Sequence, residues 1–153
     1  WALPPLPTTQ VSLSTRPKFS WRRSAKSSRS WRCSRTNSAH TATNTGHITT
    51  GFGRRAAVSP DRAYTQAPAA YGQGTARDVF IEGVLALPDD IASMIRIFVH
   101  DEIVLSVPPE RAEEIKEAAV ATFESVHIPC AGGVSVSTLA DAVGPADDWS
   151  GCK

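Results

Sequence analysis

The chain has 153 residues, of which 41% are apolar and 20% charged, so it fits one modest globular domain rather than two full cores. Its net charge of +1 conceals an asymmetry, because residues 1–60 contain ten Lys and Arg and no acid, whereas all 15 acids follow beside six bases. This contrast predicts two separate parts. No apolar run approaches the roughly 20 residues that span a bilayer, and no signal-peptide apolar region is visible, so no membrane partner is expected.

The cysteines also limit the class of protein. Cys33, Cys130 and Cys152 lie far apart and lack metal-ligand spacing. An odd and sparse set favours free thiols in a reducing compartment, without a disulfide partner. The first residue is Trp1 rather than Met, so we expect a fragment of a longer product.

Residues 1–45 form an unassigned basic segment, rich in Ser, Thr and Arg and without a sustained helical or strand period. Such a segment buries too little apolar surface to offset chain entropy, so disorder is expected. Three interpretations of its origin stay open: a basic arm that binds nucleic acid, an organellar transit peptide, or a stretch translated in a shifted reading frame.

Ordinary composition returns with residues 46–53, which predict a short extended ribbon with glycine turns, followed by Arg54 and Arg55. An apolar i, i+3, i+4 stripe predicts a helix over residues 74–87, ended by Pro88.

The remaining elements predict an α+β fold. Strands rich in β-branched and aromatic residues are expected at 94–99 and 103–107, and their brief connection predicts an antiparallel hairpin. An amphipathic helix over 110–125 is expected to cover one face of that hairpin. A last strand near 134–137 precedes an acidic tail that contains Trp149.

The connection itself, His100-Asp101-Glu102, carries the most informative chemistry. Two adjacent carboxylates on a stiff turn suit hard divalent cations, which prefer oxygen ligands. Two such ions can activate an attacking hydroxyl and stabilise a leaving pyrophosphate. The alternative is an ordinary charged turn, which many proteins contain.

Four segments in the same order resemble family A DNA polymerases. Phe98–Pro108 is similar to the family's palm hairpin, in which His-Asp-Glu lies between apolar strands. Residues 71–78, Tyr-Gly-Gln-Gly-Thr-Ala-Arg-Asp, resemble its Gln-Gly-Thr-Ala-x-Asp segment, and residues 46–55 resemble its Gly-x-x-x-Thr-x-x-Gly-Arg-Arg ribbon. Residues 144–149 are similar to its closing Gly-x-x-Trp element. The resemblance identifies residues 46–153 as the C-terminal part of a polymerase palm.

The resemblance also implies roles for particular residues. Asp101 would be a catalytic ligand for Mg²⁺, with Glu102 close to the same ions. His100 would contact the primer strand, and Gln73 the minor groove near the primer terminus. Arg54 and Arg55 would lie near the DNA backbone. The implied partners are primer-template DNA and deoxynucleoside triphosphates. The resemblance also implies an enzyme encoded by a bacterium or a phage, which acts in the bacterial cytoplasm at the nucleoid.

The family pattern is incomplete in this chain. Its second metal-binding Asp, in an Asp-x-Ser-x-x-Glu setting, is missing because no acid precedes Asp61. Arg22-x-x-x-Lys26 has the spacing of the fingers helix but lacks the aromatic-Gly pair that follows it in the family. We therefore predict a fragment, inactive alone, of an enzyme for templated nucleotidyl transfer in DNA replication or repair. The alternatives are a non-catalytic nucleic-acid-binding remnant and a metal-dependent hydrolase that uses Asp101 and Glu102.

Overall fold

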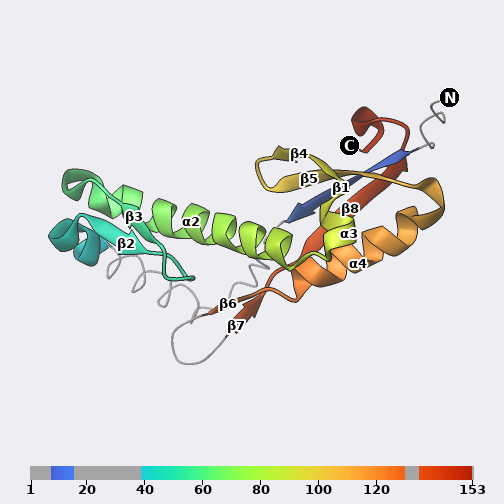
Figure 1. Cartoon of the computed structure of the whole chain (residues 1–153). Helices are drawn as coiled ribbons and strands as arrows, with labels where there is room; N and C mark the ends of the chain where they lie inside the picture. The colour runs from blue at the N-terminus through green and yellow to red at the C-terminus, as the bar shows by residue number, and fades with distance from the viewer. Residues whose placement is uncertain (1–7, 16–38, 130–134, 153) are drawn as a thin grey trace, which may run out of the picture. The chain divides into compact units, whose positions relative to one another are not determined.

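The computed structural model describes residues 8–15, 39–129 and 135–152 (Figure 1). Contacts within the chain divide these residues into two compact units. Unit 1 comprises residues 8–15, 79–127 and 137–152, and unit 2 comprises residues 39–78, 128–129 and 135–136. The expected boundary after residue 45 stays a prediction.

Unit 1 is built on a four-stranded antiparallel sheet in the order β4-β5-β1-β8 (Figure 1). Its strands are β4 (Ile95–Val99), β5 (Glu102–Val107), β1 (Thr9–Thr15) and β8 (Ala140–Ala146). Helix α4 (Ala112–Glu124) packs against the sheet, and the short α3 (Asp89–Ala92) and the end of α2 (Ala63–Ala86) complete the layer. This arrangement confirms the α+β class and the predicted hairpin.

The core of unit 1 lies between the sheet and these helices. Alternate residues of two strands, Val11 and Leu13 of β1 and Ile103 and Leu105 of β5, point into it, since side chains along a strand face opposite sides. The α4 face contributes the residues that its 3.6-residue period predicts, Ala112, Ile115, Ala119 and Phe123, all of them buried.

Strand β1 corrects the expectation that residues 1–45 are disordered, which is wrong for Thr9–Thr15 and for a helix over residues 39–45. Alternation of apolar and polar residues from Thr9 to Thr15 was the available signal, and Val11 and Leu13 are almost fully buried. Residues 1–7 and 16–38, including the Arg22 to Lys26 spacing, lie outside the described residues.

Two further elements differ from the expectation. Helix α2 begins at Ala63, eleven residues before the predicted start, although it contains Pro68. Burial of Ala63 and Ala67 against Ile48 and Val58 provides tertiary packing that overrides the local signals. Strand β8 was not predicted because glycine and proline lie within its sequence, yet pairing with β1 holds it in the sheet.

Unit 2 contains the predicted ribbon as an antiparallel pair, β2 (His47–Thr49) and β3 (Arg55–Ala57), followed by a 3-10 turn (Pro60–Arg62) and the first part of α2. Its core is a small cluster: Ala42, Ile48, Val58, Ala63 and Ala67. The predicted last strand is present as β7 (Ser135–Ser137), which pairs with β6 (His127–Pro129).

The chain ends in a 3-10 turn (Trp149–Cys152) in which Cys152 is free and buried. Its Sγ lies 3.3 Å from the carbonyl oxygen of Gln10, and burial raises the pKa of the thiol. Cys33 and Cys130 lie outside the described residues. Over the part of the chain that the structure describes, no helix is long and apolar enough to cross a membrane.

Gly83 of α2 lies where the core of unit 1 leaves no room for a side chain. A Cβ at this position would lie 2.4 Å from the ring of the fully buried Phe123. We expect Gly83→Ala to lower the free energy of unfolding by about 1–3 kcal/mol, because the ring must move. In the same helix, a Cβ at Gly72 meets nothing within 4 Å. Gly72→Ala should therefore stabilise the chain by about 0.5–1 kcal/mol. Urea unfolding followed by circular dichroism compares the two, and equal effects would contradict the packing assignment.

Candidate functional site

The tip of the β4–β5 hairpin is a two-residue loop. Val99 pairs with Glu102, which leaves only His100 and Asp101 between the strands. His100 has a φ of 55° and is, among the described residues, the one non-glycine residue with positive φ. A two-residue loop requires this left-handed conformation, which glycine adopts at lower cost. The loop therefore presents an exposed imidazole and an exposed carboxylate side by side.

Glu102 occupies a different environment from Asp101. It is the first residue of β5 rather than part of the turn, and its side chain is half-buried. Its Oε1 accepts a hydrogen bond from the hydroxyl of Ser12 on the neighbouring strand β1. Ser12 is itself buried on the sheet face opposite Val11 and Leu13. This contact, which we did not predict, ties the hairpin to β1.

These residues alone do not fit a two-ion magnesium site. Within the described ranges, no group of three or more His, Cys, Asp and Glu side chains could hold a metal ion. Strand β1, which lies beside the hairpin, carries hydroxyl groups and no carboxylate from Thr9 to Thr15. Both edges of β5 are occupied, one by β4 and the other by β1. A further strand that carried a carboxylate could pair with β5 only in place of β4 or β1.

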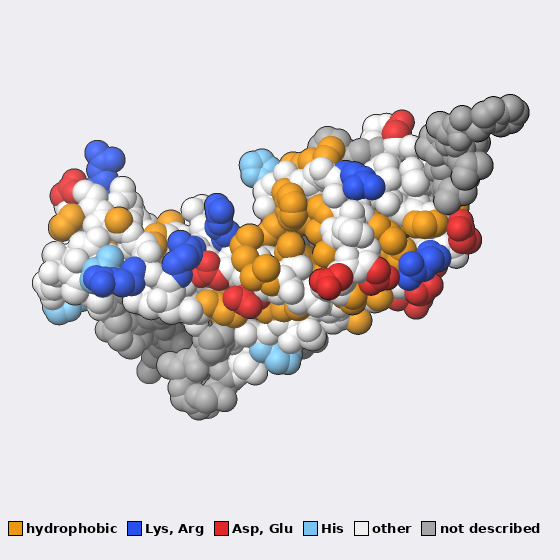
Figure 2. Space-filling view, in the orientation of Figure 1, with side chains coloured by type: hydrophobic (Ala, Val, Ile, Leu, Met, Phe, Trp, Pro, Cys, Tyr) orange, Lys and Arg blue, Asp and Glu red, His pale blue; other side chains and the backbone are white. Residues whose placement is uncertain are grey.

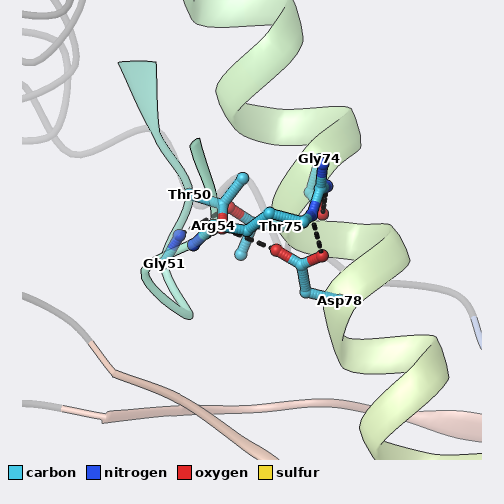
Figure 3. Close-up of polar contacts among 6 residues, drawn as sticks. All are labelled: Thr50, Gly51, Arg54, Gly74, Thr75 and Asp78. Carbon is cyan, nitrogen blue, oxygen red and sulfur yellow. Dashed lines mark hydrogen bonds and ion pairs between the residues drawn. The ribbon is translucent and has the colours of Figure 1, made fainter. Parts of the chain in front are cut away.

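In unit 2, the motifs of residues 46–55 and 71–78 meet at Asp78 of α2 (Figure 3). Its Oδ2 accepts a hydrogen bond of 2.6 Å from Thr50 Oγ1, and its Oδ1 forms an ion pair of 2.6 Å with Arg54 Nε. The Asp78 side chain is only 12% exposed. Asp78 therefore fastens the ribbon to the helix.

Further contacts complete this junction. Arg54 Nη2 donates to the carbonyl oxygen of Gly74 at 3.1 Å, and the Gly51 amide donates to Thr75 Oγ1 at 3.0 Å. A Cβ at Gly74 would lie 2.9 Å from a methyl group of Thr50, so the close approach needs glycine there. We call Thr50, Gly51, Arg54, Gly74, Thr75 and Asp78 the ribbon–helix junction. All six lie within the two motifs of residues 46–55 and 71–78, whose contact with each other was not predicted.

The predicted DNA-binding residues of unit 2 have different surroundings. Gln73 is exposed on α2. Arg55 is exposed, and its Nη2 lies 3.2 Å from His47 Nδ1. Arg54 is half-exposed and belongs to the ribbon–helix junction, so it is not the freely solvated arginine that an exposed position would offer. Their DNA contacts, like the roles of His100, Asp101 and Glu102, stay predictions.

Removal of the charge at Asp78 should loosen unit 2. We expect Asp78→Asn to lower the free energy of unfolding by about 1–3 kcal/mol, because two hydrogen bonds to a charged carboxylate are weakened. Asp61→Asn is the matched control, since Asp61 and its partner Arg62 are 71% and 72% exposed and 3.7 Å apart. Such an exposed pair contributes at most about 1 kcal/mol. Hydrogen exchange at residues 47–57 should accelerate only in Asp78→Asn, and unchanged exchange there would refute the fastening role.

Relief of the backbone strain at residue 100 should stabilise the hairpin. His100→Gly is expected to raise the free energy of unfolding by about 0.5–1 kcal/mol, because glycine adopts positive φ without the Cβ clash. Asp101→Gly serves as the control, since residue 101 has no positive φ and only gains freedom in the unfolded chain. Thermal unfolding measures both, and no gain for His100→Gly would contradict the strain.

A solved structure of a polymerase domain is similar to this chain. The POL domain of Pol1 from M. smegmatis, solved in complex with DNA primer-template and dNTP, is similar over 79% of this chain with a TM-score of 0.61. The two sequences are 18% identical, and this chain spans only 23% of the length of that structure. No protein-family model and no curated protein matches the sequence. The likeness shows that this chain shares its fold with part of a polymerase domain.

Proposed function

We propose that the chain is the C-terminal part of the palm of a family A DNA polymerase, whose parent enzyme catalyses templated nucleotidyl transfer. In that reaction the 3′ hydroxyl of a primer attacks a deoxynucleoside triphosphate and pyrophosphate leaves. The observation that carries the proposal is the two-residue loop of His100 and Asp101 at the tip of an apolar hairpin. Residues held in sparsely populated backbone regions cluster at functional sites, and the φ of 55° at His100 fits that pattern.

The ribbon–helix junction adds independent support. The two motifs of residues 46–55 and 71–78 resemble the same family, and they interlock through Asp78, Arg54 and Thr50. Accidental matches would have no reason to be in contact. The similarity to the POL domain of Pol1 agrees with a polymerase fold, although it carries no residue roles.

The roles proposed here are those that the resemblance implies, and the exposure of the side chains supports them. Asp101 is exposed at the loop and would be one carboxylate of the parent's Mg²⁺ site, with Glu102 beside it. His100 would contact the primer strand, and Gln73 would contact the minor groove, where acceptors of correctly paired bases are alike. The parent enzyme would supply the further carboxylates from another part of its chain, since no acid precedes Asp61 in this one.

The chain by itself fits the second candidate, a non-catalytic nucleic-acid-binding remnant. The specific observation is that the strand beside the hairpin presents Ser12 to Glu102 where a metal site would require another carboxylate. Without a complete site, transition-state stabilisation is lost, and that loss commonly costs orders of magnitude in rate.

Primer extension tests the proposal. The chain alone with Mg²⁺ should give no product, whereas an enzyme that restores the upstream palm and fingers should extend the primer. In the restored enzyme, Asp101→Ala should reduce kcat at least about 100-fold, as loss of a transition-state-stabilising group commonly does. Asp147→Ala, which removes an exposed carboxylate of unit 1 outside the hairpin, should leave kcat unchanged. Unchanged extension by Asp101→Ala would refute the role of the hairpin.

A further inference from the structure

The charges of the two units differ in sign. The described residues of unit 1 contain three basic and thirteen acidic side chains, a balance of −10. In unit 2, residues 39–78 contain four arginines and two acids, a balance of +2. Figure 2 shows red acidic side chains over α3 and α4 of unit 1 and, in unit 2, blue side chains over the ribbon and α2. Nucleic-acid phosphates are bound chiefly by Lys and Arg, so unit 2 is the better surface for them.

The four arginines of unit 2 are not equally available. Arg54 is paired with Asp78 at 2.6 Å, Arg62 lies 3.7 Å from Asp61, and Arg55 contacts His47. The fourth, Arg77, is exposed, and over the described part of the chain it has neither an ion pair nor a side-chain hydrogen bond. Asp78, the next residue in the helix, forms its ion pair with Arg54 rather than with Arg77, since adjacent helical residues do not face each other.

Arg77 also lies close to Gln73, the residue for which a DNA contact is proposed. It follows Gln73 by four residues in α2, so the two exposed side chains are neighbours on one face of the helix. One further turn back, at four residues before Gln73, the same face carries the exposed Ala69, which leaves the surface open. A DNA duplex whose minor groove contacts Gln73 would place backbone phosphates along this face of the helix.

We propose that Arg77 binds a phosphate of primer-template DNA beside Gln73, and that the Arg54–Asp78 ion pair frees it to do so. The inference rests on the proposed function for its ligand and adds a residue to the DNA contacts that the resemblance implies. Phosphate contacts fix the position of a protein on the duplex without reading its sequence. Arg77 is therefore a positioning residue.

Fluorescence anisotropy of the full chain with a labelled primer-template duplex tests this contact. Kd is measured at salt concentrations from about 50 to about 200 mM, where the affinity of phosphate contacts falls steeply with salt. Arg77→Ala should weaken binding and reduce the slope of log K against log salt by about 1, the value for one lost phosphate contact. Arg77→Lys should keep the wild-type slope, because it keeps the charge. Every variant contains the basic residues 16–35, so the slopes are compared with that of the wild-type chain.

Arg96→Ala is the matched control, since Arg96 is an exposed arginine on β4 of unit 1. It should leave the slope unchanged. The inference is overturned if Arg77→Ala has the slope of Arg96→Ala, or if Arg77→Lys loses as much as Arg77→Ala. An unchanged circular dichroism spectrum of Arg77→Ala shows that folding is intact.

The two proposals fail separately. A normal slope for Arg77→Ala, together with loss of primer extension for Asp101→Ala, overturns the Arg77 contact alone. A reduced slope for Arg77→Ala, together with normal extension by Asp101→Ala in the restored enzyme, overturns the proposed function and keeps a DNA-binding surface on α2.

Discussion

The sheet of unit 1 depends on strand β1. Thr9–Thr15 lies between β5 and β8 and pairs with both, so it joins the β4–β5 hairpin to β8. An isolated hairpin is only weakly stable in water, and a third strand with a buried face is what allows it to persist. Val11 and Leu13 provide that face, and Ser12 bonds Glu102 on the other. The environment of Glu102 is thus set by a residue 90 positions away in the sequence.

Three carboxylates of this chain, Asp78, Asp101 and Glu102, differ in their burial. Asp78 is almost buried and satisfied by Arg54 and Thr50, which suits a fastening role. Glu102 is half-buried and bonded to Ser12, whereas Asp101 is exposed at a strained loop. A buried carboxylate needs such partners to offset the loss of hydration. An exposed carboxylate retains much of its hydration.

Much of the fold could be predicted from local pattern. The hairpin followed from its β-branched strands, α4 from its 3.6-residue period, and β2–β3 from the glycine turns. The failures have a common physical reason. Strands β1 and β8 and the first turns of α2 are stabilised by partners distant in sequence. Pro68 gave a local signal against α2, and Gly144 and Pro145 gave one against β8. Tertiary burial outweighed those local preferences.

By itself, the sequence determined the α+β class, the hairpin that carries His100 and Asp101, and the motifs that resemble a polymerase palm. These features are encoded by neighbouring residues, through periodicity, turn chemistry and motif order. Only the tertiary structure decided that β1 belongs to the sheet, that Ser12 faces Glu102, and that Arg54 is held by Asp78. The physical reason is that burial and pairing depend on which distant segments come together, and side-chain partners in turn decide which charges remain available to a ligand.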